Sequence, residues 1–319
     1  MLNSIALARR FMKMGEVLPV FDMNNIGERR EVFNHDAFIK GDAEQRREIM
    51  RKSSESKEKD ETAFSFDNYF GFQLRPYLEG KDVLDLGCFT GGRTVAWFKN
   101  YGFQHAAGID VEQVFIDAAD QYALLSGVNC EFKLGFGENI PYSSNIFDAV
   151  LTFDVLEHVV DVERTMEECW MVLKPGGSMF LVFPTYLQPN EHHLGMVSKV
   201  PGLQLMFSGS ALVRAYYEII DERGAAAYWY RRDSPELSSH EKGNTINGMS
   251  FAKFSRIVKK MGWKDTYTSR APVGSIGRSV MRHRVRRAVM QLALPMTFVP
   301  FLQEIVLHRV TKVLVKPLA

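Results

Sequence analysis

Short apolar runs recur along the middle of the chain, and each one ends in a polar or glycine-rich turn. Uninterrupted runs of this kind are typical of strands in a parallel sheet, because helices cover both faces of such a sheet. The runs predict four strands, at residues 83–86, 105–110, 146–153 and 178–183. The pattern therefore indicates an α/β protein with a doubly wound sheet.

The C-terminal part continues the alternation of helix and strand. Ser250 is a typical helix N-cap, and the helix that follows it is predicted to end at Gly262. Residues 263–269 predict a sixth strand, and the apolar residues at 304–316 predict a closing antiparallel strand.

A glycine-rich turn follows the first predicted strand. Asp85 and Gly87 stand where the strand ends, and Gly91 closes the turn ahead of a predicted helix. This arrangement brings backbone N–H groups and a helix N-terminus close to a bound cofactor. Dinucleotide-binding loops need the spacing Gly-x-Gly-x-x-Gly, but Phe89 occupies the second glycine position. The loop therefore disfavours a nicotinamide dehydrogenase.

A second acid ends the next strand. Asp110 lies about 20 residues beyond the glycine loop, where a carboxylate can accept hydrogen bonds from ribose hydroxyls. A Gly-Phe-Gly loop at 135–142 and a Leu-Lys-Pro-Gly-Gly turn at 173–177 precede the fourth and fifth strands.

These motifs, in this order, resemble the class I S-adenosylmethionine (SAM) methyltransferases, especially those of ubiquinone and menaquinone biosynthesis. The resemblance covers roughly residues 64–185, with weaker support from 248 to 316. It implies a Rossmann-like, seven-stranded, mostly parallel sheet with SAM as cofactor. It also implies a set of cofactor-binding residues: Asp85, Gly87, Cys88, Gly91, Asp110, Phe136, Gly137 and Asp154.

Phe136 departs from the family pattern, because relatives usually carry an Asp that accepts from the adenine amino group. Here the backbone of Phe136 and Gly137 could take that role while the ring packs on the purine. The alternative is that Phe136 is a core residue, and the sequence favours neither.

The chain divides into four parts. The SAM-binding half is expected at 62–185 and the C-terminal part of the same domain at 248–319. Residues 1–61 are expected to form an extension with a charged, solvated helix or linker. Residues 186–247 form an insertion after the fifth strand. An insertion at the carboxyl edge of a parallel sheet is expected to act as a helical lid over the substrate.

Two groups of histidines are candidates for the general base that a hydroxyl acceptor would need. His158 follows the fourth strand, and His192 and His193 lie at the start of the insertion. Histidine titrates near neutral pH, which suits proton abstraction. We rank the insertion histidines first, because many relatives carry Glu-His at the position of His158, where the histidine can be a packing residue or a helix hydrogen-bond donor.

A metal site is the alternative for the same residues. Residues 154–159 predict the start of a helix, which would put Asp154, Glu157 and His158 on one face. With His192 or His193 they would form a divalent-metal set. This resembles the metal-assisted RNA 2′-O-methyltransferases. The chain lacks the basic, aromatic surface expected of an RNA-end binder, so we assign no metal ligand.

Composition limits the partners and the compartment. The net charge of +1 gives no global field that would recruit nucleic acid. The three cysteines lie far apart, without a disulfide or zinc spacing, which favours the cytoplasm. Residues 1–14 have no long apolar core, so we expect no signal peptide.

One segment near the C-terminus suggests a membrane. Residues 278–287 are rich in arginine, and the run from 288 to 303 that follows carries no charge. That run is shorter than the ~18 residues of a spanning helix. Residues 278–303 could therefore contact a membrane surface peripherally, or form core or lid helices, which we favour.

Taken together, the sequence predicts a SAM-dependent O-methyltransferase that acts on a small or medium-sized metabolite. A sugar, a lipid-linked intermediate or a natural-product hydroxyl would fit. The alternative in another class is a catalytically silent SAM-fold protein that serves as a binding partner.

Overall fold

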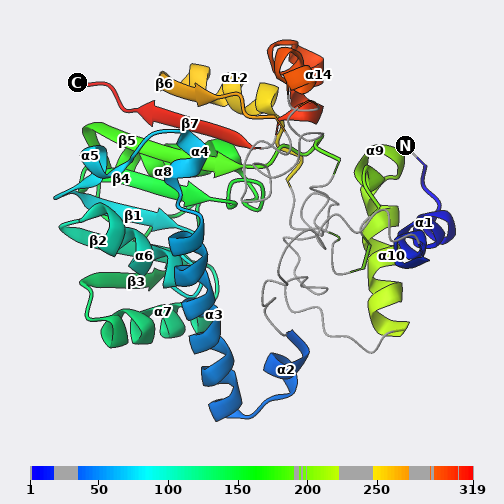
Figure 1. Cartoon of the computed structure of the whole chain (residues 1–319), viewed down its shortest axis with the longest axis horizontal. Coiled ribbons are helices and arrows are strands. Elements are labelled where there is room, and N and C mark those ends of the chain that lie inside the picture. Colours follow the sequence, from blue (N-terminus) through cyan, green and yellow to red (C-terminus); the bar gives the residue numbers. More distant parts are fainter. Residues whose placement is uncertain are drawn as a thin grey trace.

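Seven strands form one sheet in the order β3-β2-β1-β4-β5-β7-β6 (Figure 1). The computed structural model describes residues 2–17, 35–189, 194, 197–198, 200–222, 247–272, 288, 291–307 and 309–318. Every adjacent pair is parallel except those that include β7, which runs antiparallel to β5 and β6. The predicted fold class is confirmed. The strands are β1 (Asp82–Leu86), β2 (His105–Asp110), β3 (Cys130–Leu134), β4 (Phe147–Phe153), β5 (Leu173–Phe183), β6 (Lys264–Ser269) and β7 (Val310–Val315).

Helices pack on both faces of the sheet. One face packs against α8 (Val162–Val172) and α12 (Phe251–Met261) through the core that contains Leu84 and Val150. The other packs against α4 (Asp67–Phe70), α5 (Arg75–Leu78) and α6 (Gly92–Tyr101). The remaining helix of this half, α7 (Gln113–Ser126), joins β2 to β3. Since successive strand residues point to opposite faces, Asp85 lies on the α6 face.

The C-terminal elements match the prediction closely, with one difference. Ser250 caps α12 by accepting from the Lys253 amide at 3.1 Å, and Gly262 ends the helix with a φ of 78°. The closing strand begins later than predicted. Residues before it form the short helix α14 (Pro300–Val306), so only the second half of 304–316 is strand.

The charged stretch near the N-terminus forms α3 (Ala43–Ala63), a long helix that packs against α6. Ser54 Oγ donates to the Thr90 carbonyl at 2.7 Å. The buried Glu61 carboxylate accepts from Trp97 Nε1 and from the Phe66 amide, each at 3.0 Å. The stretch predicted as a solvated helix or linker is therefore a helix. Its Ser54 contacts the glycine loop, and its Glu61 contacts α6. A shorter helix, α2 (His35–Lys40), precedes α3.

Gly92, at the start of α6, lies against the backbone of α3. A Cβ there would sit 1.9 Å from the Ser54 carbonyl oxygen. We expect Gly92→Ala to lower the free energy of unfolding by about 1–3 kcal/mol, because α3 must move away from α6. Chemical denaturation would measure the loss. The control is Asn100→Ala, at an exposed position of the same helix, which should change stability by less than about 0.5 kcal/mol. Equal stability of the two variants would contradict the tight α3–α6 contact.

The inserted residues contribute a separate small core. It contains α9 (Leu203–Met206) and α10 (Gly209–Glu222), and it is completed by α1 (Ile5–Val17) from the other end of the chain. Figure 1 shows α1 beside α10. Ala8 and Met12 of α1 are buried there, and Lys13 Nζ lies 2.6 Å from Glu222 Oε2. The start of the N-terminal extension thus packs against the inserted residues. Tyr216 of α10 is buried within this core.

Candidate functional site

The glycine loop between β1 and α6 has the form that the sequence predicts. Gly87 has a φ of 81°, and a Cβ added there would lie 2.3 Å from Val155 Cγ2. Gly91 has a φ of 73°, and its Cβ would lie 2.7 Å from that of Ala119. A side chain at either position would therefore clash with Val155 or Ala119, so the two glycines let the loop pack tightly. Cys88 is buried in the same loop, and burial raises the pKa of its thiol, so it is not a reactive cysteine.

Phe89 has an unusual backbone conformation, and its ring packs against residues outside the glycine loop. Its φ is 51°, in the left-handed region that is unusual for a residue other than glycine. The ring packs on that of Phe115, with centroids 4.5 Å apart, in the cluster that α2 and α3 help to form. Its amide donates to Asp110 Oδ2 at 2.9 Å. The loop is thereby tied to the acid at the end of β2.

Two carboxylates lie at the adjacent ends of β1 and β2. Asp85 is buried and accepts from Thr94 Oγ1 at 2.5 Å. Burial raises its pKa to about 7, against the opposing effect of that hydrogen bond. Asp110 accepts from the Phe89 and Glu112 amides, and burial raises its pKa to about 6. Nearby, the buried Thr90 hydroxyl has no hydrogen-bond partner within the described part of the chain.

The raised pKa of Asp110 predicts a pH dependence of SAM binding. Ribose hydroxyls donate to a carboxylate, so the ionised form of Asp110 is the binding form. As pH falls through about 6 the carboxyl takes up a proton, so we expect SAM affinity to drop about tenfold between pH 8 and pH 5. Calorimetric titration across this range would measure it. Asp110→Asn, which cannot ionise, should lose this dependence; an unchanged profile in that variant would assign the titration to another group such as Asp85.

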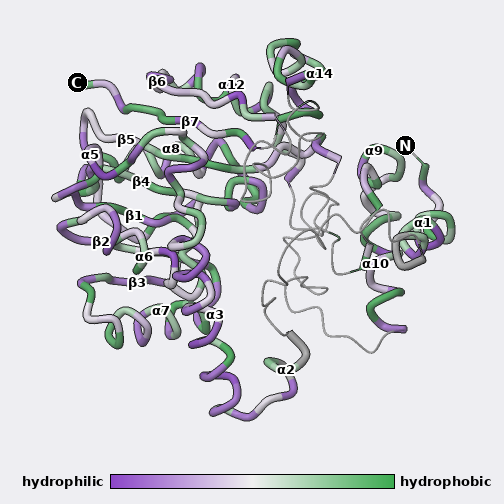
Figure 2. The backbone as a smooth tube through the Cα atoms, in the orientation of Figure 1, coloured by the Kyte–Doolittle hydropathy of each residue, from purple (hydrophilic) through white to green (hydrophobic). Residues whose placement is uncertain are grey.

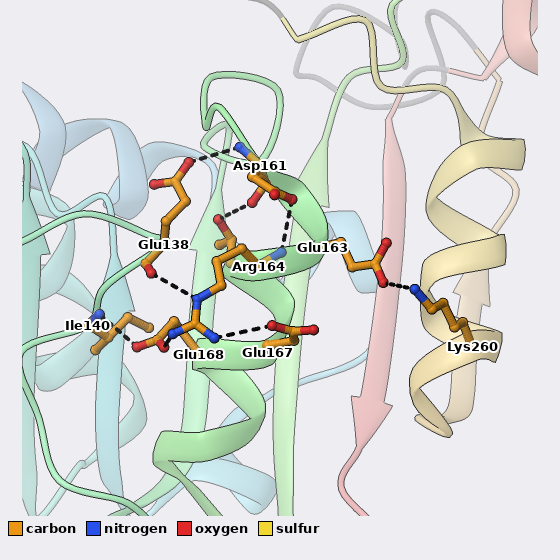
Figure 3. Close-up of polar contacts among 9 residues, drawn as sticks. Glu138, Ile140, Asp161, Glu163, Arg164, Glu167, Glu168 and Lys260 are labelled. Atoms are coloured by element: carbon orange, nitrogen blue, oxygen red, sulfur yellow. Dashed lines mark hydrogen bonds and ion pairs between the residues drawn. The ribbon is translucent and has the colours of Figure 1, made fainter. Parts of the chain in front are cut away.

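The loop at 135–142 is held firmly against α8 (Figure 3). Glu138 Oε1 accepts from the Val160 and Asp161 amides at 2.7 and 3.0 Å. Glu168 Oε2 accepts from the Ile140 amide at 3.0 Å, and Arg164 bridges Glu168 and the Glu138 carbonyl. The loop that resembles the family's adenine loop is therefore fixed before any ligand binds.

Phe136 and Gly137 differ in their surroundings on this loop. Phe136 has about half of its surface exposed, so its reading as a core residue is wrong. Its packing on a purine stays a prediction. Gly137 is buried, and a Cβ there would lie 3.0 Å from Thr165 on α8. The lack of a side chain thus lets the loop approach α8.

The segment after β4 is a series of turns, and the predicted helix at 154–159 is wrong. Asp154 has a φ of 55°, which a right-handed helix does not allow. Asn247, from the far end of the insertion, also donates its side-chain amide to the Leu156 and Val159 carbonyls at 2.6 and 2.8 Å. These carbonyls therefore bond across the fold, and α8 begins only at Val162.

The candidate base and metal residues are only partly brought together. Glu157 is buried, and His158 Nε2 lies 3.7 Å from Glu157 Oε1 with its side chain partly exposed. Asp154 does not share a helical face with them, because no helix forms there. Within the described ranges, no three His, Cys, Asp or Glu side chains are grouped as a metal site. His192 and His193 lie outside the described residues, so their roles remain predictions.

Sequence reasoning missed two residues at the carboxyl end of β4. Arg309, just before β7, has its Nε 3.1 Å from Asp154 Oδ1. Tyr69 of α4 packs on Phe153, with centroids 5.0 Å apart. Burial and the nearby Asp154 carboxylate raise the Tyr69 pKa to about 12. Both come from segments distant in the chain, and nothing in the local sequence marks them.

A cavity of about 940 Å³ lies elsewhere, between α2, α3 and α7. None of the predicted site residues lines it. The cofactor site is therefore assigned from the loop geometry at the carboxyl ends of β1, β2 and β4, where a doubly wound sheet binds its ligands.

Comparison with known proteins agrees with this geometry. Residues 84–181, which span β1 to most of β5, match the family model described as a methyltransferase domain. Residues 84–181 therefore form a methyltransferase domain, which supports the predicted class I SAM-dependent methyltransferase superfamily. The cofactor of this domain is SAM, and the Asp110 carboxylate and the Thr90 hydroxyl are suited to hold it.

Curated relatives of this methyltransferase include enzymes with different acceptor atoms. It is 28% identical over 200 residues to norajmaline N-methyltransferase of Rauvolfia serpentina, covering 59% of this chain and 67% of that one. It is 35% identical over 104 residues to ubiquinone biosynthesis O-methyltransferase of Chelativorans sp., covering 33% and 40%. The match therefore spans less than half of the ubiquinone enzyme.

Among solved structures, a SAM-dependent methyltransferase from Methanosarcina mazei is 18% identical to this chain. The alignment covers 77% of this chain and 97% of that one, with a TM-score of 0.46.

Proposed function

We propose that this methyltransferase transfers a methyl group from SAM to a hydroxyl oxygen of a small or medium-sized metabolite. The observation that carries the proposal is the convergence of three elements at the carboxyl edge of the sheet. These are the glycine loop at 87–91, the Asp110 carboxylate and the turn that presents His158 beside the buried Glu157. A sugar, a lipid-linked intermediate or a natural-product hydroxyl fits this proposal.

Each residue has a distinct role in the proposal. SAM supplies the methyl group on a sulfonium centre. Asp85, Gly87, Cys88 and Gly91 shape the loop around the cofactor, and Asp110 accepts from its ribose. The half-exposed Phe136 covers the purine, and the backbone of Gly137 lies beside it. Asp154, held by Arg309, borders the methyl-transfer position. Orientation of the acceptor supplies much of the rate, because the displacement must be in line.

A histidine completes the site by removing the proton from the acceptor hydroxyl. His192 or His193 is placed first in this role and His158 second. The lid formed by α1, α9 and α10 would exclude water, which favours the loss of charge as the methyl group leaves the sulfonium.

The proposal also includes the location of the enzyme. Cys88, Cys130 and Cys169 are all free thiols, which suits the cytoplasm. A peripheral membrane contact through residues 278–303 is part of the same proposal. Within the described residues, no helix is long and apolar enough to cross a bilayer.

The test is a screen for methylated products. The purified chain is incubated with SAM and candidate hydroxyl compounds, and products are read by mass spectrometry with the methylated atom assigned by NMR. An O-methylated product is the expected result. Methylation on nitrogen or carbon would overturn the choice of acceptor atom. SAM binding by calorimetry without turnover on any acceptor would favour the silent binding protein instead.

A further inference from the structure

In the segment at 291–306, several polar side chains are buried and several large apolar side chains are exposed. Thr297, Gln303 and Glu304 are buried, whereas Leu292, Phe298 and Phe301 are 76%, 64% and 69% exposed. Leu294 and Val299 are also exposed. Figure 2 shows hydrophobic stretches, coloured green, in the α14 coil. The core-helix interpretation of this segment is therefore wrong for its described residues, because the large apolar side chains point to solvent.

Hydrogen bonds to the rest of the domain fix this orientation. The Glu304 carboxylate accepts from the Phe251 and Ala252 amides, each at 2.8 Å, at the start of α12. The Glu304 carbonyl accepts from Thr185 Oγ1 at 2.8 Å. Turning the segment to bury its phenylalanines would break the bonds of a buried carboxylate, which is costly. The apolar side is therefore held outward.

A positive charge lies against this surface. The guanidinium of Arg270 lies 4.8 Å from the centre of the Phe298 ring and donates to the Thr297 carbonyl at 2.9 Å. Residues 273–287, which precede the segment, lie outside the described residues, but their sequence contains several arginines and no Asp or Glu. Arg284, Arg286 and Arg287 are at most four residues from Ala288 in the sequence.

We propose that residues 291–306 dock on an anionic lipid bilayer surface. Leu292, Phe298 and Phe301 would enter the boundary between headgroups and acyl chains, and the adjacent arginines would attract acidic headgroups. Exposed apolar side chains alone would suit a protein partner equally well. The arginines that precede the uncharged run, together with Arg270 against Phe298, are what favour an anionic membrane.

The surface also lies close to the acceptor side of the site. The chain runs from α14 through the buried Leu307 to Arg309, which pairs with Asp154 at the end of β4. This part of the inference rests on the proposed function. It favours the lipid-linked class of hydroxyl acceptor, because a docked enzyme would receive its acceptor from the membrane.

Sedimentation with vesicles tests the docking directly and needs no acceptor. The intact chain is mixed with vesicles made of equal parts phosphatidylcholine and phosphatidylglycerol. The double variant Phe298→Ser/Phe301→Ser should bind at least about tenfold more weakly. The matched control is Leu124→Ser/Leu125→Ser on α7, whose side chains are 82% and 74% exposed, and which should bind like the wild type. Pure phosphatidylcholine vesicles, or added salt, should weaken wild-type binding.

Other outcomes would overturn the proposal. Wild-type binding that is absent, or unchanged in the phenylalanine variant, would exclude docking through this surface. A concentration-dependent dimer that forms without vesicles and is lost in the same variant would make the surface an interface between two copies. SAM affinity, measured by calorimetry, should be equal in all variants. A failure of vesicle binding with SAM binding intact therefore leaves the proposed methyl transfer standing.

Discussion

Replacing Asp110 by alanine is expected to weaken SAM binding by roughly 1.5–3 kcal/mol, or about 10- to 150-fold. The carboxylate lies at the end of β2, where it can accept from ribose hydroxyls. The alanine also frees the Phe89 amide, which Asp110 Oδ2 accepts at 2.9 Å in the wild type. Both losses act in the same direction. Calorimetric titration of SAM into the purified variant would measure the effect.

Two further variants separate these losses. Asp110→Asn keeps an oxygen acceptor but has no charge, so it should fall between the wild type and the alanine variant. Asp117→Ala removes an exposed carboxylate from α7, which begins just after Asp110, and should leave SAM affinity unchanged. A folded Asp110→Ala variant with wild-type affinity would mean that the ribose lies elsewhere.

The parts of the fold that could be predicted are those with local signals. The strands β1, β2 and β4 are buried on both faces, so each reads as an apolar run. The glycine loop was also readable, because positive φ and close packing at Gly87 and Gly91 leave little choice of residue.

The errors came from contacts between distant segments. The pattern at 154–159 resembled a helix start, but Asn247 binds its carbonyls from across the fold. The charged residues of α3 suggested a solvated stretch, yet Ser54 and Glu61 are buried against α6 and the glycine loop. Local sequence does not report such partners.

The burial of the segment at 288–303 could not be predicted from its sequence, for a different reason. Its lack of charge fits both a buried helix and an interfacial one, and hydropathy alone cannot separate them. Burial of Glu304 and exposure of Phe301 exclude the buried helix, and this difference depends on the bonds that Glu304 makes to α12.

Removal of the catalytic histidine is expected to have the largest effect of all. If His192 or His193 is the base, its replacement by alanine should lower kcat by about 10²- to 10⁴-fold while SAM binding persists. These residues open the insertion after β5 and are therefore expected near the carboxyl edge of the sheet. The assay would use the acceptor that the product screen identifies, and kcat would be measured across pH.

The pH profile distinguishes a base from a residue that only shapes the lid. The wild-type rate should rise with pH through the range in which histidine loses its proton, and the alanine variant should lose this limb. The matched control is His105→Gln, because His105 begins β2 and Asp110 ends it. This variant should keep the wild-type kcat and its pH profile. If His158→Ala alone removes the limb, the base is the histidine beside Glu157.

A chelator separates this mechanism from the metal-assisted alternative. A histidine base needs no metal, so activity should survive EDTA. Activity that is lost with EDTA and restored by a divalent ion would favour a metal held by Asp154, Glu157, His158 and an insertion histidine. The turn at 154–158 argues against this set, because it separates Asp154 from the other two instead of placing all three on one helical face. If both insertion histidines and His158 can be removed with little change in kcat, acceptor orientation alone would account for the rate.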